Sequence, residues 1–484
     1  MLDYLKKAAN RTQTENGAAT YRTTGSDCLD LFASIGALRG QSRNEVEQRF
    51  LFAFAEDPNL AMKILFYARD VRGGLGERAV FRTLLRWLAV HEKAALVRNL
   101  DLVAEYGRWD DLLVLLHTPA QAETVALLRR QFEADCAALA GDGEVSLLGK
   151  WLPSVNASKA QTVQQAKLLA RAFGLREAEY RKAVSALRAR LRILENHLRE
   201  RDYSFDYAQQ PAQAMLRYRK AFLRNDGARY RGYLSQVNSG AARFHTGTLM
   251  PYEIVAAAWR AADEGERAAL DATWRALEDF TNGENALVVA DGSGSMYGGS
   301  PSPAAVAQSL AIYFAEHTKG KFHNHFITFS THPQLVEIKG RDITEKVRYC
   351  QGFNEVADTN LQAVFELILR TAVAHRLPQK ELPSTLYIIS DMEFNWCTRD
   401  ASLTNFQYAQ RLFRYRGYRL PRVVFWNVRS HQRQQPVTAN AQGVALVSGC
   451  TPRIFAQVMS GEMDPYKNML RTVCTPRYEQ VSAV

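Results

Sequence analysis

The sequence lacks any apolar run approaching the roughly 18 residues that are needed to span a bilayer. Its first residues, 1–18, also lack the apolar core and the small-residue cleavage site of a secretory leader. No long linker rich in proline, glycine or serine lies near residue 282. These absences predict a globular cytoplasmic protein without a membrane partner, whose parts pack together instead of swinging freely.

Cysteine is scarce, and the groups of a hydrolytic site are missing as well. The six cysteines form no Cys-x-x-Cys pair and have no matching histidine spacing, so neither a zinc site nor a disulfide framework is expected. Ser293 has no evident histidine–aspartate relay that would activate it as a nucleophile. We therefore expect a protein without enzymatic activity.

Positive charge is what the chain has in excess. Its 484 residues include 61 Lys and Arg against 50 Asp and Glu, which gives a formal net charge of +11 at pH 7. A positive field attracts phosphate chains whatever their base sequence. The composition therefore favours RNA as a partner, without DNA specificity.

Two patterns of apolar residues divide the chain into two expected domains, residues 1–282 and 283–484. In the first, apolar residues recur three and four positions apart, which predicts helical hairpins stacked as HEAT-like repeats. In the second, short apolar runs alternate with helical stretches, which predicts a doubly wound, mostly parallel sheet between helices. The predicted fold class is multidomain, α followed by α/β. The expected strands are ALVVA, KFHNHFITFS, STLYIIS, RVVFWNV and GVALVS.

The strand ALVVA leads into the sequence DGSGSM, which places Asp291, Ser293 and Ser295 on one tight loop. The strand STLYIIS ends in the same way at Asp391, and a helix expected to open at Thr359 supplies a further hydroxyl. Ligands of open parallel sheets bind beyond the carboxyl ends of the strands. Carboxylate and hydroxyl oxygens suit a hard cation, so we expect a Mg²⁺ site, with Mn²⁺ or Ca²⁺ as alternatives. The competing explanation is that the aspartates only cap turns or helices.

These elements, DGSGSM, Thr359 and ISDM at Asp391, resemble the metal-ion-dependent adhesion site (MIDAS) of the von Willebrand factor A (vWA) domain. The first half resembles the TROVE module of Ro-type RNA-binding proteins, through RDVRGGLGER at 69–78, YGRWDDLL at 106–113 and LMPYEIVAAA at 249–258. The chain more closely resembles an uncharacterised family that joins a TROVE-like module to a vWA-like domain. The resemblance implies a ring or arc of helical repeats that is closed by the vWA domain and holds RNA in and beside its basic hole.

Residues 159–231 are dense in lysine and arginine. If residues 181–199 form one helix, its leucines make one stripe, and a row of arginines lies about a quarter turn away. A basic face of this kind is commonly only solvated, but the likeness to an RNA-binding ring favours phosphate contact. The tyrosines between these cations either stack on bases or belong to the core. The candidate RNA-binding residues are Lys159, Lys167, Arg171, Arg181, Arg188, Arg192 and Arg199, and the tyrosines are Tyr180, Tyr203, Tyr207, Tyr218, Tyr230 and Tyr233.

Two functions of different classes follow from the sequence. In the first, the chain is a non-catalytic protein of a ribonucleoprotein, whose basic ring holds structured or aberrant RNA while the vWA metal site binds an acidic ligand or partner. In the second, it is an adaptor in a protein complex, and a partner's Asp or Glu completes the metal site. The nucleic-acid content of the purified protein distinguishes the two.

Overall fold

The computed structural model describes the whole chain except residues 282, 331, 354–359, 396–402 and 459–462. None of the helices within the described ranges is both long and apolar enough to cross a membrane. The first half contains the hairpin β1 (Arg11–Gln13) and β2 (Ala19–Tyr21), and the helices α1 (Leu2–Ala9), α2 (Asp27–Phe32), α3 (Arg43–Glu56), α4 (Pro58–Arg69), α5 (Ala79–His91), α6 (Lys93–Arg98), α7 (Leu102–Tyr106), α8 (Trp109–Leu112), α9 (Gln121–Ala140), α10 (Leu148–Trp151), α11 (Ala160–Ala172), α12 (Glu177–Arg190), α13 (Leu194–Glu200), α14 (Ala212–Asn225), α15 (Gly227–Asn238), α16 (Pro251–Ala258) and α17 (Glu264–Arg275).

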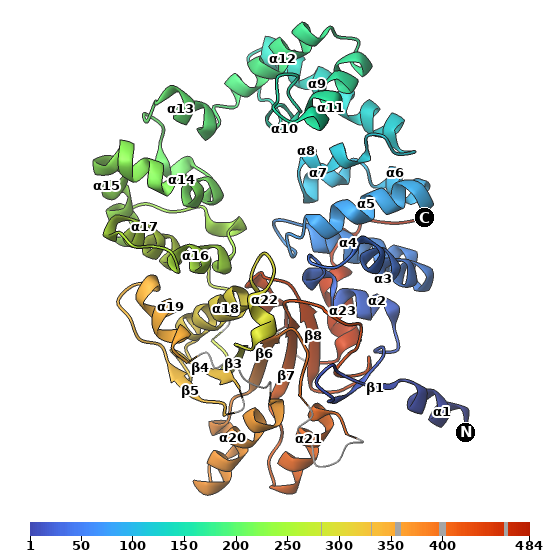
Figure 1. Cartoon of the computed structure of the whole chain (residues 1–484), viewed down its shortest axis with the longest axis vertical. Coiled ribbons are helices and arrows are strands. Elements are labelled where there is room, and N and C mark those ends of the chain that lie inside the picture. Colours follow the sequence, from blue (N-terminus) through green and yellow to red (C-terminus); the bar gives the residue numbers. More distant parts are fainter. Residues whose placement is uncertain (282, 331, 354–359, 396–402, 459–462) are drawn as a thin grey trace.

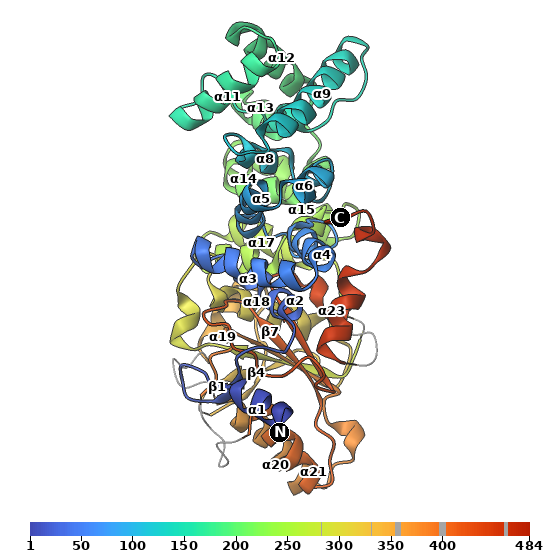
Figure 2. The same ribbon diagram turned by 90° about the vertical axis from the view of Figure 1, so that its right-hand side faces the viewer.

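The helices of the first half form an arc, and both of its ends rest on the second half (Figure 1). The arc rises through α3 to α8, turns over at α9 to α12 and returns through α13 to α17, and Figure 2 shows it edge-on above the sheet. At the returning end, Trp274 Nε1 donates to Glu316 Oε2 at 2.7 Å. At the starting end, the Gly36 amide donates to Ser448 Oγ at 3.0 Å. The two halves therefore pack together, as the absence of a long linker predicted.

The second half is an α/β domain built on six strands in the order β5-β4-β3-β6-β7-β8. The pairs formed by β3, β4, β6, β7 and β8 are parallel, and only the edge strand β5 is antiparallel to its neighbour. All five expected strands are confirmed, whereas the short edge strand β5 was not expected. The elements are β3 (Ala286–Asp291), α18 (Pro303–His317), β4 (His325–Phe329), β5 (Leu335–Glu337), α19 (Ile343–Gln351), α20 (Leu361–Ala374), β6 (Thr385–Ser390), α21 (Asn405–Tyr415), β7 (Arg422–Asn427), β8 (Val444–Ser448), α22 (Arg453–Val458) and α23 (Pro465–Val473).

Helices cover both faces of the sheet, which confirms the doubly wound prediction. Side chains of α20 and α21 pack on one face and form a core of their own. Helices α18, α22 and α23 cover the opposite face, and α19 packs against α16, α17 and α18. The apolar side chains of all four belong to the same continuous core as the starting end of the arc. The arc and the sheet domain thus share one hydrophobic core, which fixes their relative position.

The prediction of one helix over residues 181–199 is wrong. Helix α12 ends at Arg190, helix α13 begins at Leu194, and Arg192 between them has a left-handed backbone with φ of 43°. The reason is tertiary packing, because Leu187 belongs to the core shared with the sheet domain and Leu194 belongs to a separate cluster around Phe222. The chain passes from one cluster to the other, so the leucines and the arginines do not form two continuous stripes.

Candidate nucleic-acid interface and metal centre

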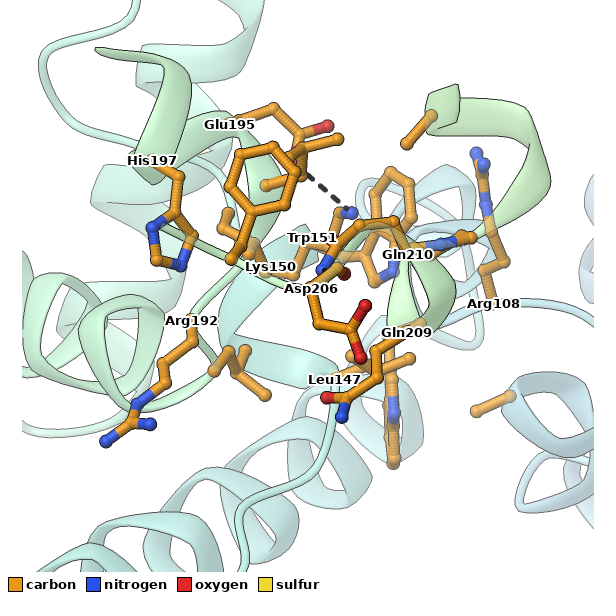
Figure 3. A pocket seen from close by; sticks show the side chains of 18 of the residues that line it. Arg108, Leu147, Lys150, Trp151, Arg192, Glu195, His197, Asp206, Gln209 and Gln210 are labelled. Atoms are coloured by element: carbon orange, nitrogen blue, oxygen red, sulfur yellow. Dashed lines mark hydrogen bonds and ion pairs between the residues drawn. The ribbon is translucent and has the colours of Figure 1, made fainter. Parts of the chain in front are cut away.

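A cavity of about 840 Å³ lies on the inner side of the arc, between its rising and returning limbs. Residues of and beside α10 form part of its lining. The rising limb contributes the loops around α7 and α8, and the returning limb contributes α13 and residues 204–214. In Figure 3, Arg108 and Arg192 lie on opposite sides of this cavity, with Asp206, Gln209 and Gln210 between them. Residues from distant parts of the sequence therefore form one concave surface.

Cations and aromatic rings line this cavity together. The Arg108 guanidinium lies 4.0 Å from the ring centre of Trp151 and also donates two hydrogen bonds to Asp110, each of 2.9 Å. Lys150 Nζ lies 5.5 Å from the same ring. Arg72 and Arg192 are exposed lining residues, and neither side chain makes an ion pair or a hydrogen bond with the described residues. Two guanidinium groups are therefore available to an anion that enters the cavity.

The acidic side chains of the cavity are both engaged with the protein. Asp206 accepts a hydrogen bond of 2.9 Å from the Ala208 amide and so caps a short 3-10 turn. Glu195 Oε2 lies 3.7 Å from Lys150 Nζ, a contact drawn in Figure 3. This separation is longer than a charge-assisted hydrogen bond, so the lysine is only weakly held. The cavity therefore has an excess of uncommitted positive charge.

The structure separates the seven candidate RNA-binding residues. Arg192 lines the cavity, whereas Lys167 and Arg171 line a second cavity of about 650 Å³ between α9 and α11. Arg188 donates to the carbonyl oxygens of Gly149 and Leu152, at 3.0 and 2.6 Å, and thereby ties α12 to α10. Of the remaining three, Arg199 pairs with Glu200 at 2.8 Å, and Arg181 and Lys159 are exposed.

The tyrosines between the cations are mainly core residues. Tyr180, Tyr207, Tyr230 and Tyr233 are buried, and Tyr203 and Tyr218 are partly buried. The aromatic side chains that do line the cavity are Trp109, Trp151 and Phe205, which sequence reasoning missed. The available signal was a cation directly before a tryptophan, in GRWDD and again in GKW.

The DGSGSM loop lies at the point where the order of the strands reverses, since β3 has β4 on one side and β6 on the other. This is where ligands bind in doubly wound sheets. Asp291 is buried, and it accepts hydrogen bonds from the Ser293 amide at 2.9 Å and from Ser390 Oγ at 2.6 Å. The hydroxyls of Ser293 and Ser295 lie 3.2 Å apart, and Ser295 is exposed. The loop thus presents the side chain of Ser295 to the outside, while Ser293 and Asp291 are buried.

Asp391 meets Asp291 at the same edge of the sheet. Burial, followed by the negative charge of Asp391, raises the pKa of Asp291 to about 7. Asp391 is buried as well, and its Oδ2 atom has no hydrogen-bond partner among the described residues. A buried carboxylate oxygen without a hydrogen-bond partner fits a ligand of a hard cation, because carboxylate oxygens are among the preferred ligands of such a cation.

Two further observations concern the candidate metal centre. Thr359 lies outside the described residues, and α20 begins two positions later at Leu361. Within the described part of the chain, no three His, Cys, Asp or Glu side chains converge closely enough to hold an ion. A cation at this edge of the sheet would therefore need the serine hydroxyls in addition to the two aspartates.

Comparison with known proteins gives the following similarities. A protein-family model described as a domain of unknown function, DUF2828, matches residues 14–134 and 160–284, and a second one, DUF7788, matches residues 285–475. The chain is 30% identical to the uncharacterized protein L728 of Acanthamoeba polyphaga mimivirus over 511 residues, which cover 97% of this chain and 88% of that protein. The crystal structure of the Ro (RSR) protein of Deinococcus radiodurans covers 93% of this chain and 99% of its own, with 14% identity and a TM-score of 0.47.

Proposed function

The chain belongs to the DUF2828 family, and we propose that it is a non-catalytic RNA-binding protein that holds RNA at the inner side of its arc. One observation carries the proposal: Arg72 and Arg192, which have no partner among the described residues, line the same cavity as Trp109 and Trp151. Phosphate-neutralising cations beside aromatic faces are the components of sites for single-stranded nucleic acid. The net charge of +11 supports the same class of partner.

The cavity favours unpaired nucleotides over a duplex. Its volume of about 840 Å³ lies within the range of small-molecule pockets and leaves no room for a double helix. Bases that are unstacked from a loop or an end can stack on aromatic side chains, and their edges can pair with amides such as those of Gln209 and Gln210. A structured or aberrant RNA would therefore insert a single-stranded segment here.

The second part of the proposal concerns the metal centre. Asp291, Ser293, Ser295 and Asp391 would hold a divalent cation, which when bound supplies a Lewis-acidic position for a carboxylate or phosphate oxygen. The exposure of Ser295 supports access to such a ligand from outside. The buried carboxylate of Asp291 keeps the loop in place, since it accepts hydrogen bonds from the Ser293 amide of its own loop and from Ser390 Oγ of the neighbouring strand.

RNA binding is tested by changing Arg72 and Arg192 to Gln together and titrating a single-stranded RNA at several salt concentrations. Each lost phosphate contact should reduce the slope of log affinity against log salt by roughly 0.7, so the double variant should lose about 1.4. The matched control changes Arg414 and Arg419, exposed arginines of and beyond α21 on the far side of the sheet, and should keep the wild-type slope. Equal slopes in all three proteins would contradict the proposal and favour the adaptor.

A further inference from the structure

His431, on the loop after β7, lies beside the proposed metal centre. Its Nε2 atom is 3.7 Å from Asp391 Oδ2, and the Asp391 side chain is completely buried. Both atoms are inaccessible to solvent, and neither has a hydrogen-bond partner within the described residues. Buried polar atoms in proteins nearly always have a partner, so two of them facing each other point to a shared ligand.

The distance between these atoms suits two ligands of one ion better than a direct bond. At 3.7 Å the separation exceeds the range of a hydrogen bond. Nitrogen and oxygen ligands lie about 2.0–2.2 Å from a bound divalent ion, so two of them lie roughly 3–4 Å apart. The imidazole and the carboxylate are therefore spaced as neighbours in one coordination shell.

The arc holds the histidine loop in place. Arg49 of α3 donates to Ser430 Oγ at 2.9 Å, and the Ser430 amide donates to the Ala37 carbonyl oxygen at 3.1 Å. Gln41 Nε2 donates to the Ser430 carbonyl oxygen at 2.5 Å. The position of the histidine thus follows from contacts between the two halves, and the vWA-like motif in the sequence gives no sign of it.

We propose that His431 is a ligand of the cation at this centre, and that the centre consequently selects Mn²⁺ or a later transition-metal ion over Mg²⁺ and Ca²⁺. Imidazole suits transition metals, whereas an all-oxygen shell suits Mg²⁺ and Ca²⁺. The inference rests on the metal centre proposed above. It replaces the expected hard-ion site with a mixed site in which His431 supplies a nitrogen, Asp391 a carboxylate oxygen and the serines their hydroxyls, while Asp291 stays hydrogen-bonded to the Ser293 amide and to Ser390 Oγ.

The competing explanation is a plain ion pair, in which a protonated His431 offsets the charge of Asp391 and binds no metal. Mn²⁺ separates the two, because it is paramagnetic and its electron spin couples to a nitrogen nucleus that is bound directly. We expect pulsed electron paramagnetic resonance of the full-length chain with Mn²⁺ to show coupling to ¹⁴N. Incorporating ¹⁵N-histidine should convert this signal to the ¹⁵N pattern without any substitution in the protein.

The variant His431→Gln should lose the nitrogen coupling and should lower the ratio of Mn²⁺ to Mg²⁺ affinity at least about tenfold. Even the removal of a residue that only hydrogen-bonds a metal ligand typically costs this much in metal affinity. The control His332→Gln, at an exposed histidine of the same domain, should retain both. Bound Mn²⁺ without histidine coupling in the wild type would overturn the role of His431 and leave the metal centre standing. Absence of any Mn²⁺ or Mg²⁺ binding in the wild type would remove the centre itself.

Discussion

Arg477 and Asp70 lie 407 positions apart in the sequence and form a two-point ion pair, in which the guanidinium donates from Nε to Oδ2 and from Nη2 to Oδ1, the latter at 2.7 Å. The hydroxyl of Tyr478 donates to the same carboxylate at 2.9 Å. Asp70 is completely buried at the end of α4. The C-terminal segment therefore fastens the rising limb of the arc to the rest of the molecule.

Replacing Arg477 with Gln should lower the free energy of unfolding by about 1–3 kcal/mol, because the buried carboxylate of Asp70 loses a charged partner. Burial alone would raise the pKa of Asp70, but hydrogen bonds led by that of Arg477 hold it below the ordinary 3.8. Because the pKa of Asp70 is lower in the folded than in the unfolded chain, ionised Asp70 stabilises the fold at pH values above the unfolded pKa. This stabilisation is lost as the pH falls through the folded pKa. The difference in melting temperature between wild type and variant should therefore shrink below about pH 4, and an unchanged difference there would contradict this account.

Arg188 should behave differently from its neighbours Arg181 and Arg192. The change Arg188→Gln removes two hydrogen bonds to carbonyl oxygens of the α10 region and should cost about 2 kcal/mol of unfolding free energy. Arg181→Gln and Arg192→Gln affect exposed side chains and should stay within about 0.5 kcal/mol of wild type. Chemical denaturation of the three single variants measures the contrast, and equal stabilities would show that Arg188 is only a surface cation.

The features that could be predicted from the sequence are those that local pattern encodes. The strands β3, β6, β7 and β8 are continuous apolar runs because both faces of the sheet are covered. The positions of Asp291 and Asp391 could be predicted because they lie where two of these runs end. The edge strand β5 was missed, since it has only three residues and its outer positions are exposed. The motif DGSGSM also predicted that Ser293 and Ser295 lie on one loop, and their hydroxyls lie close together in the structure.

Features that depend on distant contacts could not be predicted. Helical periodicity shows which side of each helix is apolar, but not which of several turns faces the inside of an arc, so Arg108 and Trp151 were not recognised as neighbours. The break at Arg192 arises because two apolar clusters draw the flanking leucines apart, and no glycine or proline marks it. His431 lies beside Asp391 on a loop that is also held by the arc, since Arg49 of α3 donates to Ser430.

The N-terminal hairpin should contribute to metal binding although it is far from the aspartates in sequence. Thr14 Oγ1 donates to the Phe394 carbonyl oxygen at 2.6 Å, and Asn16 Nδ2 donates to the Glu393 carbonyl oxygen at 2.8 Å. These bonds hold the segment that directly follows Asp391. Removing residues that hold metal ligands in position commonly lowers metal affinity 10–100-fold. The double variant Thr14→Val, Asn16→Ala should therefore bind the cation about tenfold more weakly, as measured by calorimetry.

The matched control for the hairpin is Thr371→Val, which removes a hydroxyl that donates only within α20, to the Leu367 carbonyl oxygen at 2.9 Å. This variant should retain the wild-type affinity for the cation. If the hairpin variant also retained it, the segment after Asp391 would be held by the sheet alone, and the hairpin would serve only to cover it.

The substitution Asp291→Asn should change stability in opposite directions with and without metal. Asn keeps the size of the side chain and a carbonyl oxygen for the Ser293 amide, while its NH₂ group can donate to Ser390 Oγ. It also removes one of two buried charges that repel each other, because Asp391 lies close enough to raise the pKa of Asp291. In a chelator at pH 8 the variant should therefore melt at a higher temperature than the wild type.

With metal the order of the two melting temperatures should reverse. A cation at a concentration 100 times its dissociation constant should stabilise the wild type by about 2.7 kcal/mol and the Asp291→Asn variant far less. Thermal melts of both proteins with chelator and with Mn²⁺ measure this. A wild type that melts at the same temperature in both conditions would mean that the paired aspartates bind no cation.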